Sequence, residues 1–301
     1  MSSISLLLPT RKRLTRAQAF LQSIVDTADD LSRIEVIAAI DADDLESQAL
    51  SSPHPKLTLV KTIGPRNTMG ALMTRCLKHT SNNLIAAVND DIIIRSPHWD
   101  TLLLKATQAF PDEIYLLHTR DGFKDEKFPI FPILSRKTAL KLIGDPFPEV
   151  FIGDGIDAHV FDIFLRLKDL GFDRILYTPD VFFEHLHYGL GKGKWDETYH
   201  ARSAKAGNKI YHSLWRYRER LARRLALAID SENSVTSLPL QHDTPPSMQP
   251  SLWLILQTFL YTKQSWRYRL SQTQYHFARE IYILLGLHYV KRWVKQWAVS
   301  E

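Results

Sequence analysis

Cysteine is almost absent from the sequence, which has one thiol, Cys76, in 301 residues. A single cysteine forms no internal disulfide and builds no cysteine-ligated zinc site, so a reducing compartment is the expected setting. Cys76 lies in a predicted helix, where the role of a small buried apolar residue is favoured over that of a nucleophile. Disulfide-rich proteins and cysteine-ligated zinc proteins are therefore excluded.

Long apolar runs are missing as well. No stretch of about 18 uncharged apolar residues occurs, which argues against a transmembrane helix. The first apolar run, residues 4–8, precedes Arg11, Lys12 and Arg13, and this order is the wrong one for a signal peptide. We therefore expect a cytoplasmic protein and leave peripheral contact with a membrane open.

The composition that remains is that of an ordinary globular protein. With 45% hydrophobic residues, the chain can bury a core sufficient for one large domain, or for one domain with an appendage. The formal net charge of +5 favours anionic partners such as nucleotides, lipid headgroups or nucleic acid, without choosing among them.

Strand and helix patterns alternate over residues 1–200. The expected strands or extended segments are 4–8, 34–40, 57–60, 84–94, 114–118, 129–134, 175–177 and 181–183. The expected helices are 15–28, 69–79, 99–110, 135–142 and one that begins at the turn 154–157 and ends at Gly171. This alternation predicts an α/β fold with a mostly parallel sheet that is flanked by helices on both faces.

The chain changes character after residue 200. We expect a basic helix over 201–230, a polar, proline-containing linker over 231–250, and a helical C-terminal extension over 251–301 with helices 251–263 and 272–299. The last helix has a broad apolar surface beside basic residues. This surface consists of Ile281, Leu284, Leu285, Val290, Trp293, Val294 and Trp297, next to Lys291, Arg292 and Lys295. It could lie in an anionic membrane interface, pack on the α/β domain, or form a homodimer.

Polar side chains gather where the predicted strands end. The apolar stretch 84–94 is interrupted by Asn89, Asp90 and Asp91, and two adjacent buried carboxylates need a cation or hydrogen-bond donors. The alternative is a turn whose acids act as caps or lie in water. Residues 9–11 and 41–44 also follow strands, and ligands of parallel sheets bind at this edge.

Several motifs occur in a fixed order, namely 5–11 (SLLLPTR), Asp41, 89–91 (NDD), 153–157 (GDGID) and 184–187 (EHLH). Together they resemble family 2-like glycosyltransferases of the glycosyltransferase-A (GT-A) fold. The resemblance covers residues 1–200, which it identifies as a GT-A catalytic domain. It implies metal-dependent transfer of a sugar from a UDP- or GDP-linked donor to an acceptor hydroxyl, with inversion as the expected outcome.

The resemblance assigns the metal site to two segments. Asp91 looks like the metal ligand of a DxD-type motif, while Asp90 and Asn89 contact the metal or the ribose of the donor. Many relatives carry an acid in place of Asn89. A diphosphate next to carboxylates requires a cation between them, and Mg²⁺ or Mn²⁺ with oxygen ligands meets this need.

His185 and His187 would complete the metal site. They lie two residues apart on one side of an extended segment, and neutral imidazole is a good ligand for Mn²⁺. Relatives place a histidine here. The alternative for each is a solvated or a core histidine.

The nucleotide contacts implied by the resemblance are Pro9, Thr10, Arg11 and Asp41, with Arg13 or Arg11 placed to meet phosphate and Arg66 near the donor. A different role is favoured for the acids that follow Asp41. Asp43 and Asp44 are expected to cap a helix that begins at Leu45.

The catalytic base implied by the resemblance is Asp154 or Asp157, which would deprotonate the acceptor hydroxyl. Capping of the helix that follows is the alternative for both. Lys192, in a loop with Gly189, Gly191 and Gly193, suits a lid over the diphosphate, and a plain surface loop is the alternative.

Two other functions remain open from the residues. A nucleotidyltransferase-like enzyme is disfavoured because no glycine-rich basic loop follows the first strand. A non-catalytic protein could bind a polyanion or a membrane through the basic helix, in which Tyr211, Trp215 and Tyr217 alternate with arginines. The expected partners are a nucleotide sugar and a glycan, lipid-linked or other hydroxyl acceptor, whereas nucleic acid is not expected.

Overall fold

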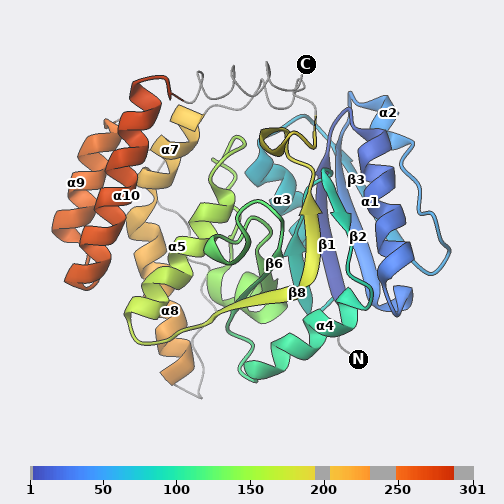
Figure 1. Ribbon diagram of the computed structural model, residues 1–301, viewed down its shortest axis with the longest axis horizontal. Helices are drawn as coiled ribbons and strands as arrows, with labels where there is room; N and C mark the ends of the chain where they lie inside the picture. The colour runs from blue at the N-terminus through green and yellow to red at the C-terminus, as the bar shows by residue number, and fades with distance from the viewer. Residues whose placement is uncertain (1–2, 194–203, 231–248, 288–301) are drawn as a thin grey trace.

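The structure is a computed structural model that describes residues 3–193, 204–230 and 249–287 (Figure 1). Its strands are β1 (Ile4–Thr10), β2 (Ile34–Asp41), β3 (Thr58–Gly64), β4 (Leu84–Ala87), β5 (Ile92–Ile94), β6 (Leu116–Arg120), β7 (Ile133–Ser135) and β8 (Ile175–His185). Its α-helices are α1 (Leu14–Thr27), α2 (Leu45–Gln48), α3 (Met69–Lys78), α4 (Trp99–Ala106), α5 (Ile156–Asp169), α7 (Ala204–Ser213), α8 (Trp215–Asp230), α9 (Ser251–Tyr261) and α10 (Trp266–Leu284). A π-helix, η4 (Lys137–Ile143), and four short 3-10 turns, η1 (Leu31–Arg33), η2 (Thr107–Ala109), η3 (Asp125–Lys127) and η5 (Tyr188–Leu190), complete the described elements.

The strands form one sheet in the order β3-β2-β1-β4-β7-β6-β8-β5. The pairs β3·β2, β2·β1, β1·β4 and β6·β8 are parallel, whereas β4·β7, β7·β6 and β8·β5 are antiparallel. Figure 1 shows the sheet in the middle of the molecule with helices on both sides. The predicted α/β fold with a mostly parallel, helix-flanked sheet is confirmed.

The central strands are buried on both faces because their side chains alternate between two hydrophobic cores. In β1, Leu6 and Leu8 join the core under α1 and α4, whereas Leu7 joins the core under α3, α5 and α8. This is the period of two expected of a strand. Cys76 belongs to the second core, as predicted, and burial raises the pKa of its thiol to about 12.

Pro9, at which we expected the first strand to end, lies inside β1 opposite Ala39 of β2. The carbonyl of Leu7 accepts a hydrogen bond from the Val88 N–H (3.0 Å), on the side of β1 where β4 lies. Backbone groups two residues apart point to the same side of a strand, so the nitrogen of Pro9 also faces that side, beyond the end of β4. None of the described strands requires an N–H at that position, and the proline is therefore tolerated.

Two predictions were wrong in the number of strands. Residues 84–94 form two strands rather than one, since the chain leaves β4 after Ala87 and becomes β5 from Ile92 on. The two short strands expected at 175–177 and 181–183 are one strand, β8. Its register against β6 jumps from Thr178 to Phe182, so a bulge accommodates Pro179 within the strand.

The predicted basic helix is two helices, α7 and α8, which meet at Leu214. Their apolar side chains belong to the core under α5, and Arg218 and Arg224 are buried. Helices α9 and α10 pack on α7 as an outer layer (Figure 1). The predicted helix 272–299 in fact begins at Trp266, while residues 288–301 and most of the predicted linker (231–248) lie outside the described residues. Among the described helices, none is long and apolar enough to span a bilayer.

Candidate active site

Asp91 and His185 lie side by side at one edge of the sheet. Ile92 pairs with His185 across β5 and β8, and the N–H of Leu186 donates to the Asp91 carbonyl (2.8 Å). These backbone contacts bring Asp91 Oδ1 to 3.4 Å from His185 Nε2, and the two side chains are only 2% and 6% exposed. The structure thus brings together the two residues predicted to be the principal metal ligands.

The surroundings of His185 suit a ligand role. Its ring makes edge contacts with Phe131 and Phe123, at centroid distances of 5.2 and 6.2 Å, which fix its orientation. Its Nδ1 atom is buried and has no hydrogen-bond partner within the described part of the chain. The ring is therefore held by packing, with a nitrogen facing the Asp91 carboxylate.

The pair fits a divalent cation that takes its other ligands from elsewhere. Neighbouring ligands of an octahedral ion, each about 2.1 Å from it, lie about 3 Å apart, close to the separation seen here. No three His, Cys, Asp or Glu side chains converge on a possible metal position in the described ranges. Mg²⁺ commonly binds one or two carboxylates and completes its shell with phosphate oxygens and water. Asp91 and His185 fit such an arrangement.

Asp90 points to other partners. Its carboxylate accepts hydrogen bonds from Arg13 (2.7 Å) and from the Thr10 hydroxyl (3.0 Å), and all three residues are buried. Burial raises the pKa of the Asp90 carboxyl, and the charge of Arg13 opposes this rise. The predicted donor-binding residues Thr10, Arg13 and Asp90 are thus one cluster, and Asn89, half-buried, lies in the chain between this cluster and β4.

Arg11 joins the loop after β1 to the loop after β2. Its guanidinium bonds Asp41 (2.9 Å) and both carboxylate oxygens of Asp43 (2.6 and 2.9 Å), and these bonds lower the pKa of Asp43. The other oxygen of Asp41, Oδ1, is buried with no hydrogen-bond partner among the described residues, and burial raises the pKa of Asp41. Asp41 therefore presents an unsatisfied acceptor at the sheet edge.

The capping prediction holds for one of its two acids. Asp44 caps α2 by accepting a hydrogen bond from the Ser47 N–H (3.2 Å), and it also accepts one from the Lys12 N–H (2.6 Å). Asp43 does not cap the helix, because Arg11 holds its carboxylate instead.

The loop before α5 places Asp154 and Asp157 at that helix's N-terminus. Gly155 has φ +102°, a conformation that side chains rarely adopt, and the carbonyl of Ile152 accepts from the Met69 N–H at the start of α3 (3.0 Å). Both acids are half-buried, and the Asp157 carboxylate accepts from the Ala158 N–H (2.8 Å). Their assignment as the base stays a prediction.

His187 is less well placed than His185. Its Nδ1 accepts a hydrogen bond from the Gly189 N–H (3.0 Å), and its ring stacks on Phe123 at 5.1 Å. The two histidine rings are 5.0 Å apart. His187 therefore lines the site, with one ring nitrogen already engaged.

Lys192 and Arg66 interact with acids other than Asp90 and Asp91. Lys192 pairs with Glu184 (2.5 Å), whose second oxygen binds Arg95 (2.7 Å). Glu184 directly precedes His185 in β8, so the two side chains point to opposite faces of the strand. Arg66 is exposed and acts on Asp43 through its charge.

The sequence reasoning missed the loop after β6. The Asp121 carbonyl accepts from the His185 N–H (3.0 Å), and its carboxylate accepts from the backbone N–H groups of Phe123 (2.6 Å) and Lys124 (2.8 Å). This turn presents Phe123 to both histidines. The signal in the sequence is an acid that directly follows a strand. The predicted strand ends at residue 118, whereas β6 ends at Arg120, so Asp121 did not stand at the end of the predicted strand.

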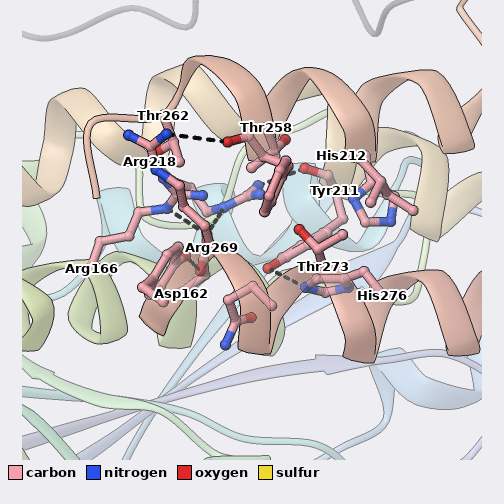
Figure 2. A pocket seen from close by; sticks show the side chains of 14 residues that line it. Asp162, Arg166, Tyr211, His212, Arg218, Thr258, Thr262, Arg269, Thr273 and His276 are labelled. Atoms are coloured by element: carbon pink, nitrogen blue, oxygen red, sulfur yellow. Dashed lines mark hydrogen bonds and ion pairs between the residues drawn. The ribbon is translucent and has the colours of Figure 1, made fainter. Parts of the chain in front are cut away.

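A second polar cluster lies away from this edge, between α5, α8 and the α9–α10 pair (Figure 2). Asp162 accepts from Arg166 (2.8 Å) and Arg218 (2.5 Å), and the Tyr268 hydroxyl donates to its other oxygen. Arg166 also donates to Thr262 (3.2 Å). All are buried, so this cluster ties the C-terminal helices to the α/β domain.

The sequence matches no protein-family model and no curated protein, but the fold resembles solved structures. TarS from S. aureus aligns with 77% of this chain at 14% identity and a TM-score of 0.50, and the aligned part is 44% of that TarS chain. A mannosyltransferase, PcManGT from Pyrobaculum calidifontis, solved with GDP-Man and Mn²⁺, aligns over 93% of this chain and 86% of its own (14% identity, TM-score 0.47). Glucosyl-3-phosphoglycerate synthase from Mycobacterium tuberculosis, solved with Mn²⁺ and UDP-Glc, aligns over 71% and 78% (16% identity, TM-score 0.48).

At these identities the likeness concerns the fold. The mostly parallel sheet with its flanking helices is similar to the GT-A fold of such solved structures. The chain therefore has a GT-A-like fold.

Proposed function

We propose that this protein is a metal-dependent glycosyltransferase that moves a sugar from a UDP- or GDP-linked donor to an acceptor hydroxyl, with inversion. The observation that supports this most directly is the approach of Asp91 to His185 at the end of the central strands. An acid and an imidazole buried together at the ligand-binding edge of a GT-A-like sheet are suited to hold Mn²⁺ or Mg²⁺.

Each neighbouring group has a role in binding the donor. When bound, the cation would neutralise the diphosphate and stabilise it as a leaving group. Asp91 and His185 would hold the cation, and Asp41 Oδ1 would accept a hydrogen bond from the nucleobase or the ribose. Thr10 and Arg13 hold the Asp90 carboxylate in place, where it would meet the ribose. The stacked rings of Phe123 and His187 would line the side of the metal site next to His185.

The chemical step requires a base on the other side of the sugar. In an inverting transfer, a carboxylate takes the proton of the acceptor hydroxyl while the oxygen attacks the anomeric carbon, and the nucleoside diphosphate departs from the opposite face. Asp154 and Asp157 stand at the half-buried α5 N-terminus, where an acceptor could approach. We assign this role to one of them, with Asp157 preferred.

The test begins with binding. Purified protein would be titrated with UDP and GDP, with and without Mn²⁺, and binding followed by calorimetry and by thermal stabilisation. We expect one nucleotide to bind in a Mn²⁺-dependent manner and the Asp91→Asn variant to lose that binding. Asp173→Asn, which alters an exposed pair with Lys168, is the matched control. Binding that is equal without metal, or unchanged in Asp91→Asn, would overturn the metal-dependent assignment.

The polyanion-binding alternative finds no support in the contacts of α7 and α8. That alternative requires exposed aromatic rings that could stack on bases. The rings it would use, those of Tyr211, Trp215 and Tyr217, are buried in the core. The Arg218 guanidinium donates to the Asp162 carboxylate (2.5 Å), and the Arg224 guanidinium donates to the Lys141 carbonyl (3.2 Å). The helices therefore use these residues for packing.

A further inference from the structure

The outward faces of α9 and α10 are apolar. On α9 the exposed large residues are Leu252, Trp253, Leu256, Leu260 and Tyr261. On α10 and just beyond it they are Trp266, Leu270, Tyr275, Phe277, Ile281, Leu284, Leu285 and Leu287. A helix on the surface of a globular protein normally turns a polar face to water, so both helices depart from the usual pattern.

Most of the exposed apolar residues lie on one side of each helix, apart from Tyr261 and Tyr275. With about 100° between successive residues, Leu252, Trp253, Leu256 and Leu260 fall within about 100° of arc on α9. On α10, Trp266, Leu270, Phe277, Ile281, Leu284 and Leu285 fall within a similar arc. The opposite faces, which include Leu254, Ile255, Tyr268 and Ile283, are buried. Each helix therefore has one apolar face that packs on the protein and a second that is exposed.

The charges around these faces have one sign. Lys263, in the turn between the helices, and Arg267 are exposed, and Arg269 and Arg279 are half-buried. The one acid between residues 249 and 287 is Glu280, which is buried and bonded to Asn208 (2.8 Å). The exposed charges of the hairpin itself are therefore all positive, and an acid next to it is Asp169 of α5, which accepts a hydrogen bond from the Ser265 N–H (2.7 Å).

We propose that the outward faces of α9 and α10, together with Lys263 and Arg267, dock on the surface of an anionic lipid bilayer, with both helices lying in the plane of the interface. Trp253 and Trp266, on these faces, are amphipathic rings of the kind enriched at the headgroup level. Apolar area and attraction between basic residues and anionic lipid together determine how strongly such helices bind. A second copy is a poorer occupant, because two hairpins packed on each other would bring the same positive charges together, and neither hairpin has an exposed acid of its own to pair them.

The hairpin is anchored to the rest of the molecule, so docking would orient the whole protein. Glu219 of α8 accepts from the Thr262 hydroxyl (2.6 Å) and the Lys263 N–H (3.0 Å) in the turn between α9 and α10. Asp162 of α5 accepts from the Tyr268 hydroxyl on α10. This inference concerns a surface distinct from the sheet edge and does not depend on the proposed reaction.

The experiment is flotation of the full-length protein with vesicles of phosphatidylcholine, alone or mixed with phosphatidylglycerol. We expect binding to the mixed vesicles that is weakened by salt, and little binding to the neutral ones. Trp253→Ser/Trp266→Ser should lose at least about tenfold in partitioning, since both rings leave the interface. Lys263→Glu/Arg267→Glu should lose at least about fivefold for each charge. Leu227→Ser, which removes an exposed apolar residue of α8, is the matched control and should bind like the wild type.

Three results would overturn the proposal. The first is no binding to either vesicle, and the second is binding that the tryptophan and charge variants leave unchanged. The third is a stable dimer in light scattering that the tryptophan variant dissociates, which would assign the face to a second copy. Circular dichroism of each variant would establish that it is folded, and because all the substituted side chains are exposed, folding is expected to be retained.

Discussion

Asp91 lies beside His185 because the chain breaks between β4 and β5. In the sheet, β4 is separated from β8 by β7 and β6, but β5 pairs with β8 so that Ile92 is opposite His185. The residue that precedes Ile92 is thereby brought to 3.4 Å from the imidazole. A continuous strand over 84–94 would have kept Asp91 next to β1 and away from the histidine.

This geometry predicts unequal effects at the proposed metal site. Asp91→Asn removes a negative charge from the cation and should lower turnover at least about 100-fold even at high Mn²⁺. His185→Gln removes a neutral ligand and should cost about 10- to 100-fold, with partial recovery as Mn²⁺ is raised. His187→Gln, with its Nδ1 held by Gly189, should change turnover by less than about threefold. Initial rates measured against Mn²⁺ concentration test the order, and a larger loss in His187→Gln would reverse our assignment.

The buried cluster around Asp162 predicts a large stability effect. Asp162→Asn would leave the guanidinium groups of Arg166 and Arg218 buried without their shared counterion, so we expect the free energy of unfolding to fall by about 3–5 kcal/mol. Asp173→Asn breaks an exposed pair with Lys168 and should cost at most about 1 kcal/mol. Urea denaturation of both variants provides the comparison. Equal midpoints would mean that Tyr268 and Thr262 hold the cluster without the carboxylate.

Two histidines beside that cluster predict acid sensitivity. Burial lowers the pKa of His276 to about 3 and that of His212 well below its usual value, and burial likewise lowers the pKa of His118, on β6, to about 4. A histidine with a depressed pKa in the folded state binds fewer protons than in the unfolded chain. Its contribution to stability is therefore complete above the unfolded pKa and is lost as the pH falls below about 6.5.

The substitution His276→Gln tests how much one buried histidine contributes to the loss of stability at acid pH. Each such histidine should remove about 1–2 kcal/mol from the free energy of unfolding between about pH 7 and pH 5. His276→Gln should make the decline shallower, because one titrating group is gone. Urea midpoints at several pH values test this, and parallel pH profiles for wild type and variant would contradict it.

A side chain at Gly70 should disturb the packing of the loop that leads to Asp154, one of the two proposed bases. A Cβ at Gly70 would lie 2.0 Å from the Pro148 carbonyl oxygen, so Gly70→Ala must displace the segment 148–152 that leads to Asp154. We expect a loss of about 1–3 kcal/mol in stability and a raised KM for the acceptor. Gly64→Ala is the control, since its Cβ would meet only the flexible end of Arg75. If Gly70→Ala matched the control in both measurements, the loop would not be coupled to the acceptor site.

The sequence by itself determined the α/β class, the helices around Phe20, Met73 and Val160, and the acids that end the strands. These features are local, because periodicity of apolar residues and strand-end polar groups are written in neighbouring positions. The order of motifs further singled out Asp91 and His185. Both predictions were possible without any knowledge of long-range contacts.

Only the tertiary structure decided which of these groups meet. The split into β4 and β5, the turn at Asp121 and the capture of Arg218 by Asp162 all depend on strand pairing or on burial against distant segments. Arginines along a helix resemble a basic surface in the sequence, yet the buried Asp162 carboxylate of α5, 56 residues away in the chain, binds Arg218 of α8 and holds it in the core. Such pairings are set by the packing of whole elements, and no local pattern in the sequence encodes them.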